Sequence, residues 1–413
     1  MADVNGRRVR RDTNRPSPGL SLLAASWVAL VLPLALPALV QAQSQVQIQA
    51  PVQVQALPAP EAIEAELQRA LAAARANGMA LAVIDGGQVT LVRTVGKRNA
   101  KGDPLLHDTV MYGASLTKAV FAYTVLQLAD EGRIDLDKPI ASTLPQPLPS
   151  YPTERQYAPW QDLAGDERWR KITPRILLSH RAGFANFAFV EPDRKLRIHF
   201  EPGQRYAYSG EGFILLQFVL ERGLGLDVGQ EMQRRVFDRF GMRNTSMQWR
   251  PDFASNLADG FASDGRVEPH DERTRVRAAG SMDTTITDFA LFAAGFMRGQ
   301  GLSAQARSEL TAAQWPISTA HQFPSLMPEL PPAQRRPDLA AGLGVVVFNG
   351  PQGPGFFKGG HNDVTGNTWV CVALRQRCVV LLANDVRAET VFPRLVKFIL
   401  GETGVPWDWE YGK

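Results

Sequence analysis

The fold is decided by residues 367–384, NTWVCVALRQRCVVLLAN. Two runs rich in β-branched and apolar residues flank a short polar segment, which is typical of two strands joined by a tight turn. If the turn is centred near Leu374-Arg375, Cys371 and Cys378 face each other across the hairpin, and a disulfide is feasible in an oxidising compartment. The alternative is a pair of small buried apolar side chains, and the sequence leaves both open.

A second hairpin is predicted near the other end of the chain. MALAVID (79–85) and QVTLVRTVG (88–96) are short strand-forming runs separated by Gly86-Gly87. The preceding segment, EAIEAELQRALAAARANG (61–78), has a strong helical pattern and ends at Asn77-Gly78, as helices commonly do. Both ends of the chain therefore favour strands with a helix beside them.

The middle of the chain has a different character. Helical patterns cover 116–131, 212–222, 229–240 and 287–298, and strand character returns at 342–348 before a last helix at about 389–400. We therefore expect an α+β fold, with one antiparallel sheet built from 61–111 and 341–402 and flanked by terminal helices. A mainly helical region, 112–340, is inserted between them, and the groove between sheet and helices is the expected ligand site.

The composition is that of an ordinary globular protein, with 45% hydrophobic and 21% charged residues among 413. The first 42 residues contain five of the 45 basic residues and two of the 41 acidic ones, so the remainder is nearly neutral. Nothing in that remainder predicts a nucleic-acid surface. The six scattered histidines have no metal-ligand spacing, and we expect no metal and no organic cofactor.

The first residues have the parts of a secretory signal. An arginine-rich start precedes the apolar run Leu20–Val40 and the small-residue site Val40-Gln41-Ala42. We predict a signal peptide at 1–42, a linker at 43–60 and a C-terminal tail at 403–413, and an exported protein that is periplasmic or secreted. A retained anchor is the alternative, since the run is about long enough to span a bilayer, and an uncleaved leader would be the only membrane contact.

The first candidate for chemistry is YGASLTK, residues 112–118. Ser115 and Lys118 are three positions apart at the start of a helical pattern, so they share one face of the helix. A serine hydroxyl needs a partner that accepts its proton, and a lysine does this only when burial or nearby cations lower its pKa. The helix is apolar nearly all round, which predicts that Lys118 is buried. A helix-capping serine with an exposed lysine is the structural alternative.

Two further segments are candidates by residue type. Tyr208 lies in a loop before an apolar helical run, and a tyrosine near a cationic lysine can act as a general base or proton relay. Lys358 precedes Gly359 and Gly360 on an expected sheet edge, where glycines let a substrate lie against the strand and leave N–H groups free for an oxyanion. Packing of a loop tyrosine and a glycine-rich turn are the structural alternatives.

Taken in order, these three segments resemble the Ser-x-x-Lys, Tyr-x-Asn and Lys-Thr-Gly elements of class C β-lactamases, D-alanyl-D-alanine carboxypeptidases and related esterases. The likeness covers roughly residues 61–400. It includes ITPRILLSHRAGF (172–184), FGMRNTSM (240–247) and AAGSMDTTITDFALF (278–292). The resemblance implies the β-lactamase/transpeptidase fold, and a serine hydrolase that acts on a small-molecule or peptide substrate.

The resemblance also assigns roles. Ser115 would attack a carbonyl carbon, and Lys118 and Tyr208 would share the proton transfers. Backbone N–H groups of Ser115 and His361 would hold the oxyanion, and Lys358 would tune the charge of the site or bind a substrate carboxylate. Water would then hydrolyse the acyl-enzyme.

Two positions depart from the family pattern. Gly210 stands where the family has asparagine, so Ser209 is expected to substitute in part as a substrate-binding residue, and Gly359 replaces the usual hydroxyl-bearing or small residue. Both changes argue against β-lactam hydrolysis more than against acyl transfer. Carboxylic esters and D-amino-acid amides are therefore the expected substrates, with β-lactams ranked behind them, and a catalytically slow penicillin-binding or sensor protein is the alternative function. His180 follows an apolar segment and is expected to be a hydrogen-bonded structural histidine.

Overall fold

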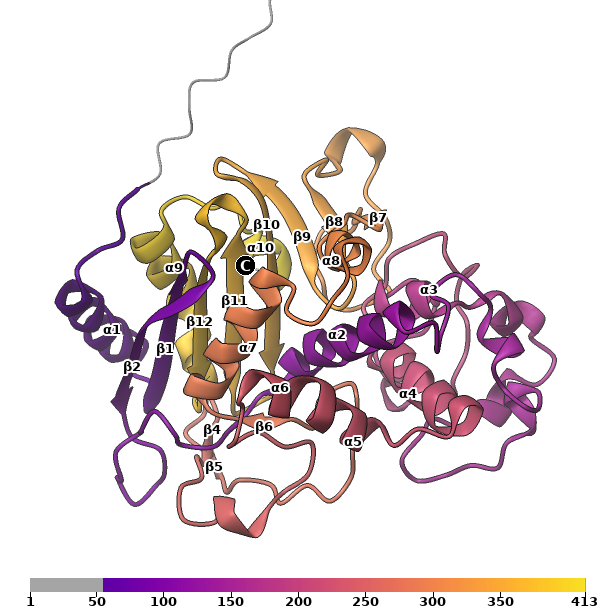
Figure 1. The fold of residues 1–413 in the computed structure, drawn as a ribbon, viewed down its shortest axis with the longest axis horizontal. Helices are drawn as coiled ribbons and strands as arrows, with labels where there is room; N and C mark the ends of the chain where they lie inside the picture. The colour runs from indigo at the N-terminus through magenta and orange to yellow at the C-terminus, as the bar shows by residue number, and fades with distance from the viewer. Residues whose placement is uncertain (1–54, 413) are drawn as a thin grey trace, which may run out of the picture. The chain divides into compact units, whose positions relative to one another are not determined.

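The computed structural model describes residues 55–412, and its largest element is an eight-stranded antiparallel sheet (Figure 1). The strand order is β2-β1-β12-β11-β10-β9-β8-β7, so strands from the two ends of the described chain are neighbours in the sheet. The strands are β1 (Gly78–Asp85), β2 (Gln88–Gly96), β7 (Trp315–Pro316), β8 (Leu339–Ala341), β9 (Val346–Gly350), β10 (Gly353–His361), β11 (Gly366–Val372) and β12 (Arg377–Ala383). The predicted α+β class with a sheet built from both ends is confirmed.

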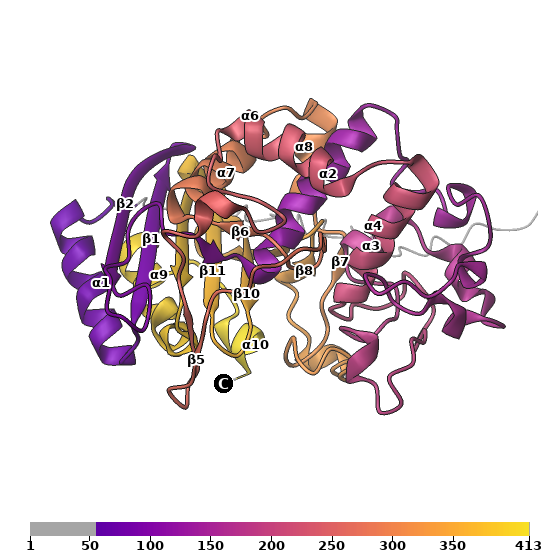
Figure 2. The same cartoon turned by 90° about the horizontal axis from the view of Figure 1, so that it is seen from below.

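Both faces of this sheet are covered. Along β1, Leu81 and Val83 pack into a core with α1 (Pro60–Ala74) and α9 (Phe392–Leu400). The alternate residues Ala82 and Ile84 belong to a second core on the opposite face, which includes α7 (Ile286–Arg298). The two views show this layering, with α1 and α9 on one side of the sheet and α7 on the other (Figures 1 and 2). A strand buried on both faces is apolar at consecutive positions, which explains the unbroken run in β1.

The two predicted hairpins are present. Gly86 and Gly87 both have positive φ in the turn between β1 and β2, as a two-residue hairpin turn requires. In the hairpin β11–β12, Cys371 pairs directly with Cys378, and their sulfur atoms are joined in a disulfide. Of the two interpretations that the sequence left open, the structure has the disulfide.

The region 112–340 contains most of the helices. They are α2 (Thr117–Asp130), α3 (Pro174–Leu178), α4 (Gly210–Leu224), α5 (Val228–Met232), α6 (Asp238–Phe240) and α8 (Ala304–Leu310), together with α7. Short two-residue strands connect its loops: β3 (Met111–Tyr112) pairs with β6 (Asp283–Thr284), and β4 (Gly260–Phe261) pairs with β5 (Val267–Glu268). The predicted helix at 229–240 is divided, because a π-helical segment, Gln233–Phe237, separates α5 from α6.

Two other segments differ from expectation. Of the strand expected at 342–348, only 346–348 are strand, as part of β9; residues 342–345 form the bend between β8 and β9, where Gly344 has a φ of +77° and donates its N–H to the Leu178 carbonyl. The expected tail contains a short helix, α10 (Trp407–Tyr411), because Trp409 is buried in the same core as α9. The predicted signal peptide and most of the predicted linker lie outside the described residues. Across residues 55–412, no helix combines the length and apolarity needed to cross a bilayer.

Candidate active site

Ser115 lies in a single 3-10 turn, Ala114–Leu116, that leads directly into α2. The preceding residue, Ala114, has a φ of +46°, which is unusual for a residue with a side chain and marks a sharp turn. Thr117 fixes this turn, because its hydroxyl donates to the Ala114 carbonyl at 2.6 Å and accepts from the Met282 N–H at 3.2 Å. The turn therefore presents Ser115 at the helix N-terminus, partly exposed to a cavity.

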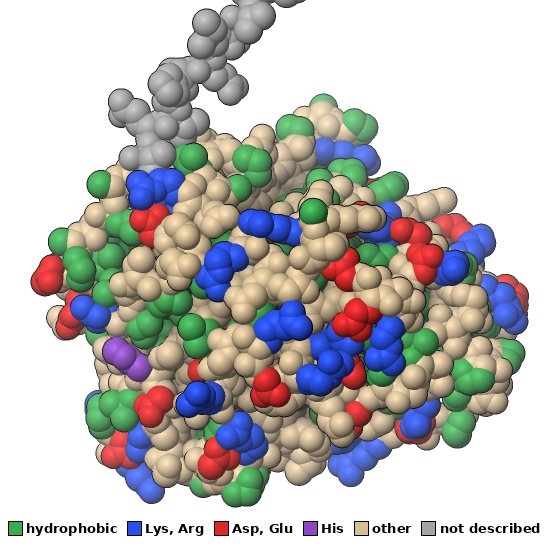
Figure 3. Space-filling model, in the orientation of Figure 1, with side chains coloured by type: hydrophobic (Ala, Val, Ile, Leu, Met, Phe, Trp, Pro, Cys, Tyr) green, Lys and Arg blue, Asp and Glu red, His purple; other side chains and the backbone are tan. Residues whose placement is uncertain are grey.

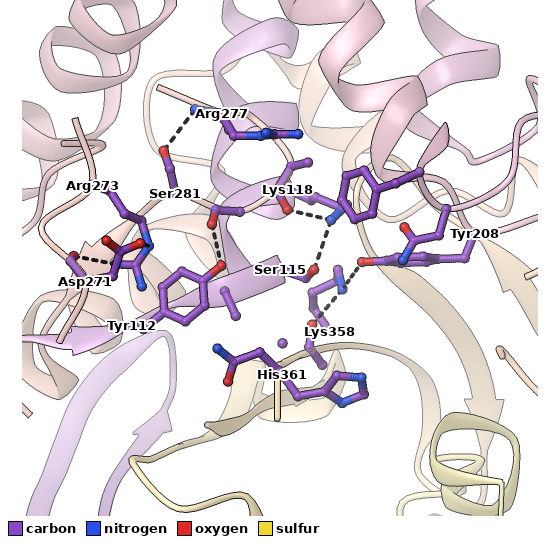
Figure 4. Close-up of a pocket in the computed structure, with 18 of the residues that line it drawn as sticks. Tyr112, Ser115, Lys118, Tyr208, Asp271, Arg273, Arg277, Ser281, Lys358 and His361 are labelled. Carbon is purple, nitrogen blue, oxygen red and sulfur yellow. Dashed lines mark hydrogen bonds and ion pairs between the residues drawn. The ribbon is translucent and has the colours of Figure 1, made fainter. Parts of the chain in front are cut away.

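Lys118 lies one turn along the same helix face. Its Nζ is 2.9 Å from Ser115 Oγ and donates to the Ala279 carbonyl at 2.6 Å (Figure 4). The side chain is buried, and this burial lowers the pKa of Lys118 to about 8, opposed by Tyr208 and reinforced by the nearby charge of Lys358. At pH 7 a lysine with that pKa is uncharged in about a tenth of molecules, far more than an exposed lysine. The amine can therefore accept the proton of the Ser115 hydroxyl.

Tyr208 lies between the two lysines of the site. Its ring centroid is 5.1 Å from Lys118 Nζ and 5.1 Å from Lys358 Nζ, and its hydroxyl accepts from Lys358 at 3.4 Å. On its other side the ring stacks on His180, whose Nδ1 accepts the Ser209 N–H at 3.0 Å. Burial, together with the charges of both lysines, holds the pKa of His180 well below its usual value, so this imidazole is neutral. The structure places His180 as expected, as a hydrogen-bonded residue that supports Tyr208.

Lys358 reaches the site from β10. It is buried, and burial lowers its pKa to about 8, with Glu410 acting in the opposite direction. Besides Tyr208, its ammonium donates to the Gly359 carbonyl at 2.6 Å. Two amines and a phenol, drawn from three distant segments, therefore meet beside Ser115.

The second half of β10 forms a local edge. Pairing with β9 ends at Phe357, whereas pairing with β11 continues to His361, so the strand has a single partner from Lys358 onward. A Cβ at Gly360 would lie 3.1 Å from the Ser115 nitrogen, so this part of the strand lies directly against the nucleophile turn. The His361 ring has its own partner, Glu389 at 3.1 Å, and this hydrogen bond raises the pKa of His361.

Ser209 does not have the role expected of it. Its side chain is buried, donates to the Ala185 carbonyl at 2.8 Å and accepts from the Gly212 N–H at 3.1 Å as the N-cap of α4. Its hydrogen-bonding groups are therefore used within the protein, and it is absent from the lining of the cavity. The structure places Ser209 as the N-cap of α4 and outside the cavity lining, so nothing in its surroundings supports the expected substrate contact.

Phe187 occupies the space beside Gly210. A Cβ on Gly210 would overlap the Phe187 ring, so the missing asparagine side chain has been replaced in volume by an aromatic ring from another segment. The ring is held in place because Asn186 Oδ1 accepts the Gly210 N–H at 3.0 Å and Glu211 Oε1 accepts the Ala188 N–H at 2.9 Å. The volume of a side chain at position 210 is thus taken by an aromatic ring, with the Asn186 amide beside it.

A similar exchange occurs at Gly359. A Cβ at this position would overlap Glu410 Oε1, so a carboxylate from α10 occupies the space of the missing hydroxyl-bearing side chain. Glu410 is buried, and its other oxygen accepts from Gln322 Nε2 at 2.7 Å. Sequence reasoning missed Phe187 and Glu410, although the two tryptophans of α10 were a sign that the expected tail is buried.

These groups line one cavity of about 560 Å³. Its roof is the segment 271–281, which is tied down where Tyr112 donates to the Gly280 carbonyl at 2.6 Å and Arg273 packs on the Tyr112 ring. Figure 4 shows Ser115, Lys118, Tyr208 and Lys358 converging at the centre, with His361 at the lower side. The face of the molecule in Figure 3 has its Lys, Arg, Asp and Glu side chains interspersed, in keeping with the near-neutral composition of this part of the chain.

Known proteins resemble this chain in sequence and in structure. It is 25% identical over 230 residues to the lovastatin esterase of Penicillium rubens, covering 49% of this chain and 57% of the relative. It is 27% identical over 201 residues to the D-alanyl-D-alanine-carboxypeptidase/endopeptidase AmpH of Escherichia coli, covering 44% and 48%. The chain thus spans about half the length of these curated relatives.

A solved structure extends the likeness to the whole fold. The D-alanine carboxypeptidase AmpC of Burkholderia cenocepacia superposes with a TM-score of 0.63 at 16% identity, covering 83% of this chain and 98% of the other. The model of the family described as Beta-lactamase matches residues 63–400, which include the serine–lysine turn, Tyr208 and the Lys-Gly-Gly strand. The resemblance stated from the motifs is therefore confirmed, and this chain belongs to the Beta-lactamase family.

Proposed function

We propose that this protein is a serine hydrolase that cleaves carboxylic esters of small molecules through an acyl-enzyme on Ser115. The proposal depends on one observation, the 2.9 Å contact between Ser115 Oγ and the buried amine of Lys118. A hydroxyl beside an amine of lowered pKa, at a helix N-terminus that favours developing negative charge, is an activated nucleophile. Hydrolysis through an acyl-enzyme fits the curated relatives, among which are an esterase and a carboxypeptidase.

The reaction has two steps. In the first, Ser115 Oγ bonds to the ester carbonyl carbon while its proton passes to Lys118, and backbone N–H groups of Ser115 and His361 stabilise the oxyanion. The intermediate then breaks the bond to the alcohol oxygen, which takes a proton relayed through Lys118 and Tyr208. In the second step, water adds to the acyl carbon and Ser115 leaves with its proton restored, releasing the carboxylic acid.

Esters are preferred to amides in this proposal because of Phe187. The ring fills the space beside Gly210, where an apolar acyl chain can pack on it, and the one side-chain amide beside Gly210, that of Asn186, already uses its Oδ1 to accept the Gly210 N–H. The acyl part of the substrate then lies against Phe187, and the alcohol part lies along Gly359 and Gly360 of β10, near Lys358. D-amino-acid peptides and β-lactams are expected to be poorer substrates than apolar esters.

The test is a panel of p-nitrophenyl esters of increasing acyl length, a D-Ala-D-Ala peptide and nitrocefin, run on the wild type and on Ser115→Ala. We expect ester turnover by the wild type and a loss of at least a thousandfold in Ser115→Ala. A fluorophosphonate should label the wild type once, on the peptide that contains Ser115. Stoichiometric labelling without turnover of any ester would instead favour the penicillin-binding or sensor alternative.

We also propose that the protein is exported to the periplasm or secreted. The arginine-rich start with its apolar run supports this, and so does the Cys371–Cys378 disulfide, because such bonds persist in oxidising compartments. Mass spectrometry of the exported protein should find a new N-terminus near residue 43. A full-length chain in the cytoplasmic fraction would contradict export.

A further inference from the structure

Glu410 is an acidic group at the part of the cavity where Lys358 would meet a substrate. Its Oε1 lies where the side chain of residue 359 would begin, and Glu410 itself lines the cavity with Lys358, Gly359 and Gly360. Oε2 is already used by Gln322, and across residues 55–412 no hydrogen bond to Oε1 is found. Glu410 is therefore a buried carboxylate with one oxygen free to accept a hydrogen bond, and a substrate bound in the cavity would contact that oxygen.

The position of Glu410 is fixed by its helix. Trp409, the preceding residue, is buried in the core near Tyr206 and Phe357, and its indole N–H donates to Thr319 at 3.2 Å. The Trp409 carbonyl accepts the Gln322 N–H at 2.9 Å, so the segment that holds the Glu410 carboxylate is bonded to α10 at two points. A side chain at position 359 would have to displace the end of the Glu410 side chain, and glycine leaves that space to the carboxylate.

The electrostatic consequence concerns Lys358. A lone ammonium at this place would attract a substrate carboxylate. Glu410 already interacts electrostatically with Lys358, and this interaction opposes the lowering of the Lys358 pKa by burial. Burial in turn raises the pKa of Glu410, and Lys358 and His361 act against this rise. In its ionised form, Glu410 would place a like charge beside a substrate carboxylate in a region of low dielectric constant, which is strongly unfavourable.

We propose that Glu410 is a specificity-determining residue that replaces the side chain missing at Gly359 and selects esters whose alcohol part carries no negative charge. This inference rests on the proposed function, since it assumes that the alcohol part of the substrate lies along β10. Oε1 would accept a hydrogen bond from an uncharged donor in the alcohol part of the substrate, such as a hydroxyl or a carboxamide N–H.

The test uses two esters of the same shape, 3-carboxyphenyl butanoate, which is anionic, and 3-carbamoylphenyl butanoate, which is neutral and donates N–H groups. The ratio of their kcat/KM values is compared between the wild type and Glu410→Gln, so that differences in intrinsic reactivity cancel. We expect the ratio of anionic to neutral substrate to rise at least tenfold in Glu410→Gln. Asp408→Asn removes the same charge from an exposed position of the same helix and should leave the ratio unchanged.

A second variant controls for the case in which Glu410→Gln disturbs the geometry of the site. Glu410→Ala combined with Gly359→Ser removes the carboxylate and places a hydroxyl-bearing side chain in the space it vacates, and this variant should also raise the ratio at least tenfold. An unchanged ratio in both variants, with Ser115→Ala inactive on both esters, would overturn the role of Glu410 and leave the hydrolase standing. Hydrolysis of both esters by Ser115→Ala would overturn the proposed function itself.

Discussion

The ring of Tyr208 stacks on the ring of His180, with centroids 4.4 Å apart, and the same imidazole accepts the N–H of the next residue, Ser209. One buried neutral side chain thus sets both the plane of the phenol and the start of α4. His180→Phe keeps a ring for stacking and removes the acceptor. We expect this variant to be less stable at pH 7 by about 1–3 kcal/mol, the cost of leaving a buried N–H unpaired.

That difference should shrink in acid. The pKa of His180 is far lower in the folded protein than the value of about 6.5 in the unfolded chain, so the unfolded state binds the proton first. The wild type therefore loses stability as the pH falls below about 6.5, and His180→Phe lacks this loss. Urea unfolding of both proteins at pH 5 and pH 7 measures the effect, and a stability difference that is equal at the two pH values would show that His180 is not buried in the neutral form.

Lys118→Met tests the base. Methionine has a similar length and no charge, so burying it costs less than burying an ammonium. We expect kcat for a p-nitrophenyl ester to fall by about 10²–10⁴, the contribution typical of a positioned general base, while the melting temperature stays equal or rises. Lys138→Met, which changes an exposed lysine, should affect neither quantity. Near-normal turnover in Lys118→Met would mean that another group accepts the Ser115 proton.

The dependence of kcat/KM on pH should reflect the titration of Lys118 and Lys358. Because Lys118 must be uncharged to accept a proton and its pKa is about 8, kcat/KM should rise with pH and bend near pH 8. The bend belongs to the coupled pair of lysines and not to Lys118 alone. In Lys358→Met a neighbouring positive charge is removed, so the pKa of Lys118 rises and the bend moves to higher pH. A bend that stays in place, or moves to lower pH, would contradict this coupling.

The two glycines of β10 should differ sharply when replaced by alanine. At Gly360 the new Cβ would lie 2.9 Å from the Leu116 nitrogen and 3.0 Å from the Gly113 carbonyl oxygen, which are backbone atoms of the nucleophile turn. These atoms cannot yield without moving Ser115, so we expect kcat/KM to fall about a hundredfold. At Gly359 the new Cβ meets only the end of a flexible side chain, Glu410, and we expect a loss below tenfold. Equal losses in the two variants would mean that Gly360 does not position Ser115.

The sequence predicted what depends on local spacing. Ser115 and Lys118 meet because three residues of a helix bring them to one face, and the Cys371–Cys378 pairing follows from the length of one hairpin turn. The sheet built from both chain ends was also predicted, because strand patterns lie at both ends and helical ones between them. Tyr208 and Lys358 were candidates by residue type, and only the family pattern placed them in one site with Ser115, since neither is near it in the sequence.

Contacts between distant segments could not be predicted in this way. Ser209 was expected to bind substrate, because a sequence does not reveal that the Ala185 carbonyl already accepts its hydroxyl. Phe187 and Glu410 fill the space beside Gly210 and Gly359, respectively. Each lies far from its glycine in the sequence, and no spacing rule connects the two members of either pair. Residues 403–413 were expected to form a tail, although burial of Trp409 in the core beside α9 holds α10 in place.

The exchange of volume at Gly359 has an evolutionary consequence. Compared with the family pattern at this one position, glycine lacks a side chain. The space of that side chain is nevertheless filled by the Glu410 carboxylate, which comes from a different segment. In homologous chains the two positions should therefore change together, with a serine or threonine at the position of Gly359 accompanied by a small or apolar residue at that of Glu410. Members of the family could then be sorted by this pair into those that admit an anion and those that repel one.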